Sequence, residues 1–237
     1  MKPHNSKPFI FKQFVIRQDK CAMKVGTDSL LLGAWVKANE PKKILDIGTG
    51  TGILALMMAQ KYPLAKIDAV EIDENAYRQA AENVLYSKFA QRIDVHHCSF
   101  QHFQTRETYD LIITNPPYFY HSKASAPERR LARHAESLPF EDILKKSISL
   151  LAEEGIFSLV LPIETSHSFI YLAQGYGLYC YQQCNVRTVQ TKSPKRCLLS
   201  FSKKVKPFFQ EELTLQDHPE KYTEEYKLLT NEFLIVF

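Results

Sequence analysis

Apolar positions along the chain fall into short continuous runs, separated by longer segments with helical spacing. The short runs predict buried strands, at 43–47, 66–72, 92–97, 109–114 and 155–161. The segments between them predict helices: 73–85 and 139–151 have apolar residues at helical spacing, 53–61 reads as a buried helix, and 163–173 can form another. Strands that alternate with helices indicate an α/β fold with a mostly parallel sheet and helices on both faces. Ligands of such sheets lie beyond the carboxyl ends of the strands.

Further elements are predicted at both ends of the chain. Residues 9–17 read as a strand or hairpin, and residues 28–37 as a helix that begins with a capping Asp28. Residues 178–189 and 196–202 predict a terminal strand pair. This pair brings the predicted sheet to seven strands, with an antiparallel strand near the C-terminus.

One predicted helix has a clear apolar face and start signal. Asp73 stands where an N-cap is expected. The apolar face is predicted to consist of Ala76, Tyr77, Ala80, Ala81, Val84 and Leu85.

Composition is typical of a globular protein, with 45% hydrophobic and 24% charged residues among 237. This length fits one domain, which we assign to residues 1–237. No apolar run approaches the ~18 residues that cross a bilayer, and residues 1–7 do not resemble a signal peptide. We therefore expect a cytoplasmic protein without a membrane partner.

The five cysteines are odd in number and accompany no export signal, which favours reduced thiols over disulfides. Cys180 and Cys184 are four residues apart, a spacing that a metal site can use. No second Cys or Cys/His pair at finger spacing lies near them, so we expect buried thiols and no metal.

The net charge of +4 is mild, but basic residues cluster in the C-terminal half. The clusters comprise Lys123, Arg129, Arg130 and Arg133, then Lys192, Lys195 and Arg196, then Lys203, Lys204 and Lys206. Any one cluster is typical of a solvated surface. Three together leave a polyanionic partner as an equal alternative.

The first strand runs into a glycine-rich loop, Asp46-Ile-Gly-Thr-Gly-Thr-Gly52, in which Gly48, Gly50 and Gly52 allow a sharp turn close to a ligand. The dinucleotide pattern G-x-G-x-x-G fails from Gly48 and fits only as the weaker G-x-G-x-x-A from Gly50. Loops that bind phosphate are usually followed by a Lys-Ser/Thr pair, and no such pair follows this loop in the sequence. The loop therefore suits S-adenosylmethionine, a nucleoside that carries a cationic amino acid, although a purely structural strand–helix connection is the alternative.

Polar residues at three strand ends are candidate ligands of that cofactor. Asp46 is placed to orient the loop and to hold the positive amino group. Glu71 ends the second strand about twenty residues after the loop, where a carboxylate accepts ribose hydroxyls. After the third strand, Ser99 is a candidate partner of the adenine amine and Phe100 a cover for the ring. A cap role for Asp73 and a core role for Phe100 are the structural alternatives.

The fourth strand ends in Asn115-Pro116-Pro117-Tyr118, and two consecutive prolines fix this backbone strongly. A conjugated amino group is a poor nucleophile. The Asn115 side-chain oxygen and the Pro116 carbonyl can accept both of its hydrogens and turn the nitrogen lone pair toward a methyl donor. Tyr118 offers a surface on which a substrate base can stack. The structural alternative is a rigid turn.

These motifs resemble those of class I S-adenosylmethionine-dependent methyltransferases acting on amino groups. More closely, Lys20–Trp35 is similar to the opening of the bacterial tRNA1(Val) adenine-37 N6-methyltransferases, and Ser193–Arg196 and Tyr222–Tyr226 are similar to later blocks of that family. The resemblance covers nearly the whole chain. It implies a Rossmann-like fold and N6-methylation of adenine 37, beside the anticodon, with tRNA as the partner.

The resemblance also implies roles for particular residues. Lys24, Thr27 and Asp28 would line the cofactor site from an N-terminal extension, residues 1–40, packed on that site. The basic residues after Tyr118 would face tRNA phosphates. Family members commonly carry an acidic residue where this chain has Ser99, and a hydroxyl accepts a hydrogen bond more weakly than a carboxylate does.

Other functions fit some of the same motifs. The tetrapeptide also serves methyltransferases of glutamine amides in release factors, but these usually have an N-terminal helical domain, for which a loop at residue 48 leaves no room. DNA adenine methylation is disfavoured because the sequence shows no additional target-recognition domain. An inactive RNA-binding scaffold is disfavoured by Asn115 and Glu71. A dehydrogenase is disfavoured by the weak glycine pattern, with the nearby histidines, His96, His97 and His102, expected in surface or core roles.

Overall fold

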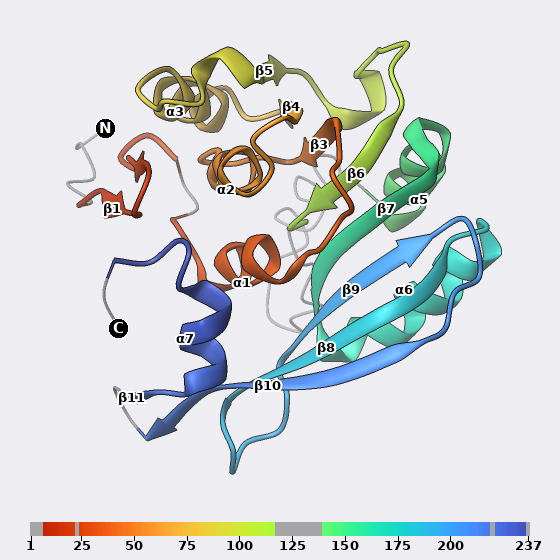
Figure 1. The fold of residues 1–237 in the computed structure, drawn as a ribbon. Helices are drawn as coiled ribbons and strands as arrows, with labels where there is room; N and C mark the ends of the chain where they lie inside the picture. The colour runs from red at the N-terminus through yellow and green to blue at the C-terminus, as the bar shows by residue number, and fades with distance from the viewer. Residues whose placement is uncertain (1–6, 22–23, 117–138, 219–220, 236–237) are drawn as a thin grey trace, which may run out of the picture.

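The computed structural model describes residues 7–21, 24–116, 139–218 and 221–235. Nine strands form one sheet in the order β11-β10-β8-β9-β7-β6-β3-β4-β5 (Figure 1). The strands that match the seven predicted ones are β3 (Lys43–Ile47), β4 (Lys66–Glu71), β5 (Ile93–His97), β6 (Tyr109–Thr114), β7 (Leu151–Pro162), β8 (Tyr179–Val189) and β9 (Arg196–Ser202). Strands β3 to β7 pair in parallel, while β9 is antiparallel to both β7 and β8. The predicted seven-stranded, mostly parallel sheet is thus confirmed as the larger part of a nine-stranded one.

Two strands extend this sheet beyond the prediction. They are β10 (Phe209–His218), parallel to β8, and β11 (Lys221–Tyr222), antiparallel to β10. Only Leu213 of β10 is buried, because most of this strand lies near the sheet edge. A strand without an apolar run gives little signal in a search for hydrophobic periodicity.

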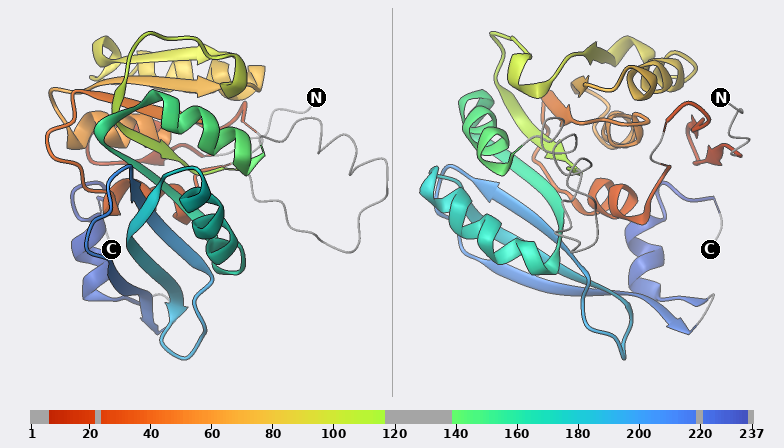
Figure 2. Two further views of the ribbon diagram at one scale, coloured as in Figure 1. Left: turned by 90° about the vertical axis from the view of Figure 1, so that its right-hand side faces the viewer. Right: turned by 180° about the vertical axis from the view of Figure 1, so that it is seen from behind.

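Helices cover both faces of the sheet. One face carries α1 (Thr27–Trp35), α2 (Ile53–Lys61), α3 (Glu74–Leu85) and α7 (Glu224–Thr230), and the other carries α5 (Phe140–Leu150) and α6 (Ile163–Gly175), as Figures 1 and 2 show. Two short 3-10 helices, η1 (Ala90–Arg92) and η2 (Phe100–His102), flank β5. Each face has its own cluster of buried apolar side chains. No helix in the described part of the chain is long and apolar enough to cross a membrane.

The N-terminal region contains a small hairpin, β1 (Phe9–Ile10) with β2 (Val15–Ile16), as predicted. The prediction that Asp28 caps α1 is wrong. The N-cap is Gly26, and Asp28 lies in the first turn of α1, where its carboxylate accepts a hydrogen bond from Arg196 Nε at 2.8 Å. The Asp28 side chain, which the local pattern assigned to a cap, instead forms a tertiary ion pair with Arg196.

The predicted apolar face of α3 needs a similar correction. Leu85 is 68% exposed, whereas Gln79 and Asn83 are buried. The Asn83 amide and Gln79 Oε1 bind backbone groups of other segments, which compensates for the burial of these atoms. The predicted N-cap of this helix is confirmed, because Asp73 Oδ1 accepts a hydrogen bond from Ala76 N at 2.8 Å.

Candidate active site

The predicted site residues that are described follow the carboxyl ends of four neighbouring strands. The loop Asp46–Gly52 follows β3, Glu71 ends β4, Ser99 follows β5 and Asn115 follows β6. These strands are adjacent in the order β6-β3-β4-β5 and run parallel. The fold therefore places the four segments at one edge of the sheet, although they are far apart in sequence.

The glycine loop depends on backbone conformations that favour glycine. Gly48, Gly50 and Gly52 have φ values of 68°, 59° and 83°, a region in which other residues are strained. Gly52 also lies against α3, since an added Cβ would come within 3.4 Å of Ala80 Cα. At Gly48 and Gly50 a Cβ would meet no described atom within 4 Å. The loop is thus packed on the side of Gly52 and open at Gly48 and Gly50, as a ligand cradle requires.

Glu71 ties the ends of β3 and β4 together. Its Oε2 accepts a hydrogen bond from Gly50 N at 2.8 Å, and its Oε1 accepts from Ile72 N and Asp73 N, both at 2.9 Å. The residue is only 8% exposed. Three backbone donors hold the carboxylate in one orientation, although it keeps acceptor capacity for a further ligand.

Asp46 lies beneath the loop and is fully buried. Its Oδ2 accepts hydrogen bonds from Thr49 Oγ1 at 2.5 Å and from Ala55 N at 3.1 Å, whereas Oδ1 has no partner among the described residues. Burial raises the pKa of this carboxyl to about 7. An uncompensated buried carboxylate oxygen beside an open loop fits a cationic ligand group, such as the amino group of S-adenosylmethionine.

We expect the buried Asp46 to make stability pH-dependent. Its pKa is near 3.8 when unfolded and about 7 when folded, so the folded protein binds the extra proton in this window. Stability that is present at low pH is therefore lost as pH rises from about 4 to 7, at up to about 1.4 kcal/mol per pH unit. Asp46→Asn should flatten the dependence of Tm on pH across this range. Asp94→Asn, at an exposed position on β5, should keep the wild-type slope; equal slopes in all three proteins would contradict the assignment.

The N-terminal segment is joined to the loop through α3. Asn83 Oδ1 accepts a hydrogen bond from Arg17 N, and its Nδ2 donates to Arg17 O at 2.8 Å and to Thr51 O at 2.9 Å. Gln79 Oε1 accepts from Lys20 N at 2.8 Å. One buried amide thus links the segment before α1 to the glycine loop. Sequence periodicity missed both residues, because a polar residue on an apolar face gives no signal of its own.

Asn83→Leu should destabilise the protein by about 2–3 kcal/mol, because it leaves buried backbone groups without partners. Urea unfolding measures this change. A matched change on the same helix is Glu82→Gln, which weakens only the surface ion pairs with Arg17 and Lys20. We expect that variant to lose less than about 1 kcal/mol; a larger loss there than in Asn83→Leu would contradict the role of the amide.

Asn115 is held by the first turn of α1. Its Nδ2 donates a hydrogen bond to Ser29 Oγ at 2.9 Å. Pro116 is buried, which anchors the backbone immediately after Asn115. Pro117 and Tyr118 lie outside the described residues, as do the basic residues predicted to follow them. Ser29 was not a candidate from the sequence, and no pattern there singles it out.

The remaining predicted residues lie around this edge in different environments. Lys24 and Thr27 are exposed near the start of α1, while Asp28 pairs with Arg196. Ser99 Oγ lies 2.8 Å from His102 Nδ1, and Phe100 is 5% exposed within the apolar core, which favours its structural alternative.

The nearby histidines have structural contacts. His96 Nε2 lies 2.6 Å from Asp68 Oδ1, and the His97 ring stacks on Tyr77 with centroids 4.9 Å apart. All five cysteines are free thiols. Within the described ranges, no group of three or more His, Cys, Asp or Glu residues is arranged to hold a metal ion.

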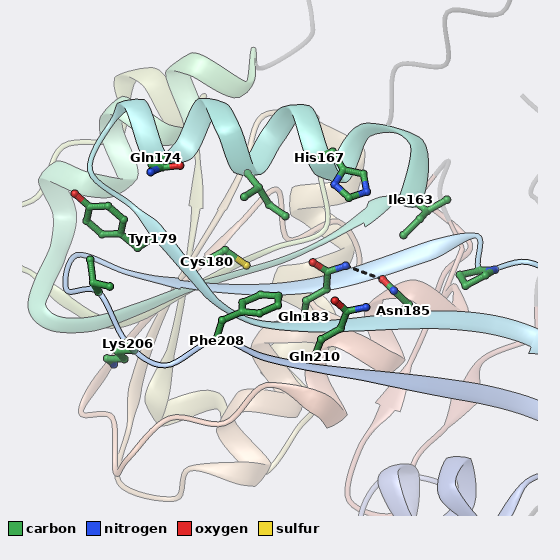
Figure 3. A pocket seen from close by; sticks show the side chains of 13 residues that line it. Ile163, His167, Gln174, Tyr179, Cys180, Gln183, Asn185, Lys206, Phe208 and Gln210 are labelled. Atoms are coloured by element: carbon green, nitrogen blue, oxygen red, sulfur yellow. Dashed lines mark hydrogen bonds between the residues drawn. The ribbon is translucent and has the colours of Figure 1, made fainter.

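A cavity of about 700 Å³ lies between α6 and strands β8 and β10 (Figure 3). Its lining includes His167, Gln183, Asn185, Phe208 and Gln210. None of its lining residues belongs to the glycine loop, to Glu71 or to Asn115. Cavity size alone therefore does not locate the candidate site, which is defined by the strand ends.

Comparisons with known proteins agree with this geometry. The family model "Methyltransferase small domain" matches residues 21–168. A protein of Bacteroides thetaiotaomicron named tRNA1(Val) (adenine(37)-N6)-methyltransferase is 44% identical over 229 residues, which cover 96% of this chain and 97% of the relative.

Solved structures show the same fold at low identity. An Agrobacterium tumefaciens protein described as a predicted O-methyltransferase superposes with a TM-score of 0.69 at 17% identity, covering 87% of this chain and 96% of the other. Pyrococcus horikoshii TYW2, solved in complex with MeSAdo, has a TM-score of 0.60 at 16% identity, covering 83% of this chain and 71% of the other. With a glycine loop, an acidic strand end and Asn115-Pro116 in neighbouring places, the chain belongs to the methyltransferase small domain family and, within it, to the tRNA1(Val) (adenine(37)-N6)-methyltransferases.

Proposed function

We propose that this protein transfers a methyl group from S-adenosylmethionine to the N6 amino group of adenine 37 in tRNA1(Val). The observation that carries the proposal is the position of Asn115. It follows the strand next to the glycine loop, and its amide is oriented by Ser29. The near full-length identity of 44% to a relative with this named activity supports the same substrate.

The residues of this chain divide into a cofactor side and an acceptor side. On the cofactor side, the carboxylates of Asp46 and Glu71 and the open loop at Gly48 and Gly50 suit the amino group and the ribose of S-adenosylmethionine. We assign Lys24, Thr27, Asp28, Gly52 and Ser99 to the surroundings of this site. Phe100, which is buried in the apolar core, is assigned a structural role. We assign residues 1–40 to an extension of the single domain 1–237, and the Asn83 amide joins Arg17 of this extension to Thr51 of the loop.

On the acceptor side, Asn115 prepares the amine for attack. Because Nδ2 donates to Ser29 Oγ, the oxygen of the same amide is directed away from that contact and suits one amine hydrogen. The Pro116 carbonyl suits the other. S-adenosylmethionine supplies the electrophilic methyl group when it is bound. The new N–C bond would form as the bond between that methyl group and the sulfonium sulfur breaks, with the electron pair passing to the sulfur. The amine nitrogen would then be cationic, and its extra proton can pass to water. Pro117 and Tyr118 are assigned to backbone rigidity and base stacking on the grounds given by the sequence.

The tRNA is a polyanion, which fits the basic residues of the hairpin between β8 and β9. Lys192 and Lys195 are exposed there, and the hairpin projects from the body of the protein (Figures 1 and 2). Phosphate neutralisation by such residues provides affinity that weakens with salt. An enzyme of tRNA would work in the cytoplasm, where its substrate is found.

The test is methyl transfer from labelled S-adenosylmethionine to unmodified bulk tRNA, to a purified valine tRNA, to DNA and to a release factor. We expect label in N6-methyladenosine of the valine tRNA. Label only in a release factor or in DNA would keep the chemistry and overturn the substrate. Cofactor binding without transfer to any of these acceptors would point to an inactive scaffold.

A further inference from the structure

A second pocket, of about 430 Å³, lies at the sheet edge between α1, α7 and the strand ends from β8 to β11. Its lining combines cationic, amide, hydroxyl and aromatic side chains, among them Arg187, Thr188, Lys195, Gln216 and Tyr222. Of the predicted cofactor residues, Thr27 and Asp28 are part of this lining, whereas the glycine loop and Glu71 are not.

The pocket and Asn115 are joined through two consecutive residues of α1. Asp28 Oδ2 accepts a hydrogen bond from Arg196 Nε at 2.8 Å, and Ser29 Oγ accepts one from Asn115 Nδ2 at 2.9 Å. Asp28 and Arg196 both line the pocket. Along the sheet, the glycine loop, Glu71 and Ser99 follow β3, β4 and β5, on one side of β6, and the pocket uses β8 to β11 on the other. An adenine presented to Asn115 therefore has these strand-end residues on one side and this pocket on the other.

The aromatic part of the pocket is rigid. Tyr222 is partly exposed and stacks on the buried Tyr226, with ring centroids 4.5 Å apart and an interplanar angle of 22°. Tyr226 belongs to the apolar core and is 4% exposed. A flat ring that is fixed in this way can stack with any nucleobase.

The charges of the pocket suit a phosphate. The acidic residue in the lining, Asp28, is paired with Arg196, and Arg187 is paired with Glu212. Lys195 is exposed, and its ammonium group has no carboxylate partner in the described part of the chain. Thr188 and Gln216 add donors and acceptors of the kind that read the edges of unpaired bases.

We propose that this pocket binds one unpaired nucleotide of the tRNA loop that flanks the target adenosine, with its base against Tyr222 and its phosphate facing Lys195. The inference rests on the proposed function and adds a recognition site to it. Sequence-specific RNA binding commonly uses unstacked loop bases held by aromatic and amide side chains. A nucleotide held here would also fix the distance of the target base from Asn115, because Asp28 and Ser29 are adjacent.

The test uses Tyr222→Leu, Tyr222→Phe and Lys195→Ala with an anticodon stem-loop of the valine tRNA. Loss of base stacking predicts a KM for RNA that is about 5- to 150-fold higher in Tyr222→Leu, since stacking contributes ~1–3 kcal/mol. The value of kcat and the Kd for S-adenosylmethionine should stay unchanged. Tyr222→Phe keeps the ring and should keep the wild-type KM, which a merely structural role of the hydroxyl would not predict. Lys195→Ala should raise KM and reduce its dependence on salt.

Matched controls come from the other cavity, where Phe208→Leu and Lys206→Ala remove an aromatic ring and a cation and should leave KM unchanged. Abasic substitution along the loop identifies the bound nucleotide, because one position should raise KM for the wild type and add nothing in Tyr222→Leu. Wild-type KM values for both Tyr222→Leu and Lys195→Ala would overturn the proposed pocket. If no abasic position behaves in this way, the pocket does not bind a base.

If the wild type methylates no tRNA, the proposed function fails. Fluorescence anisotropy of the labelled stem-loop with the same variants then decides the pocket separately.

Discussion

Asn115→Ala is expected to lower kcat for methyl transfer by about 10²–10³-fold, the usual cost of removing one preorganised polar contact in a transition state. The Kd for S-adenosylmethionine should stay near the wild-type value, because Asn115 follows β6 on the proposed acceptor side and its Nδ2 donates to Ser29 Oγ. Single-turnover kinetics with saturating cofactor and tRNA, alongside calorimetric cofactor binding, separate the two quantities. The expected pattern is a defect in the chemical step alone.

Two further variants sharpen the interpretation of that result. Ser29→Ala removes the hydroxyl that orients the amide, so kcat should fall by less than in Asn115→Ala. Asn75→Ala changes an exposed asparagine of α3 and should leave the rate unchanged. A normal kcat in Asn115→Ala would remove the residue from the mechanism, whereas an equal loss of cofactor affinity would make it a binding residue.

Glu71→Gln should raise the Kd for S-adenosylmethionine about 10- to 150-fold, on the basis of ~1.5–3 kcal/mol for hydrogen bonds to a charged group. The carboxylate accepts from Gly50 N, Ile72 N and Asp73 N. In the glutamine variant an NH₂ group replaces one of the two carboxylate oxygens. This group cannot accept a hydrogen bond, so it would face backbone N–H donors that it cannot satisfy. The substitution therefore disturbs both the ribose site and the shape of the loop.

Isothermal titration gives the cofactor Kd, and kcat at saturating cofactor should change much less than KM for the cofactor. The matched control is Glu74→Gln, three residues later on the surface of α3, where the carboxylate pairs only with Arg78. This control should bind the cofactor normally. Unchanged affinity in Glu71→Gln, together with a lowered Tm, would reduce Glu71 to a structural link between β3 and β4.

The sequence predicted the central strands and most helices because buried parallel strands are continuous apolar runs and amphipathic helices have a fixed period. Where tertiary contacts replaced that pattern, the prediction was wrong. Asp28 binds Arg196 instead of capping α1, and Leu85 is exposed while Gln79 and Asn83 are buried. Strand β10 was missed because a strand near the sheet edge with mostly polar side chains has no apolar run.

The chemistry of the site was also set largely by local sequence. Three glycines with positive φ, an acidic strand end and Asn115-Pro116 are properties of short segments, and each lies at the carboxyl end of its strand as the parallel fold requires. Their assembly is a tertiary matter. Only the folded chain brings Ser29 to Asn115, Gly50 to Glu71, and the Asn83 amide between Arg17 and Thr51. Such contacts join residues 21 to 86 positions apart, and no local period encodes the partner of a single polar side chain.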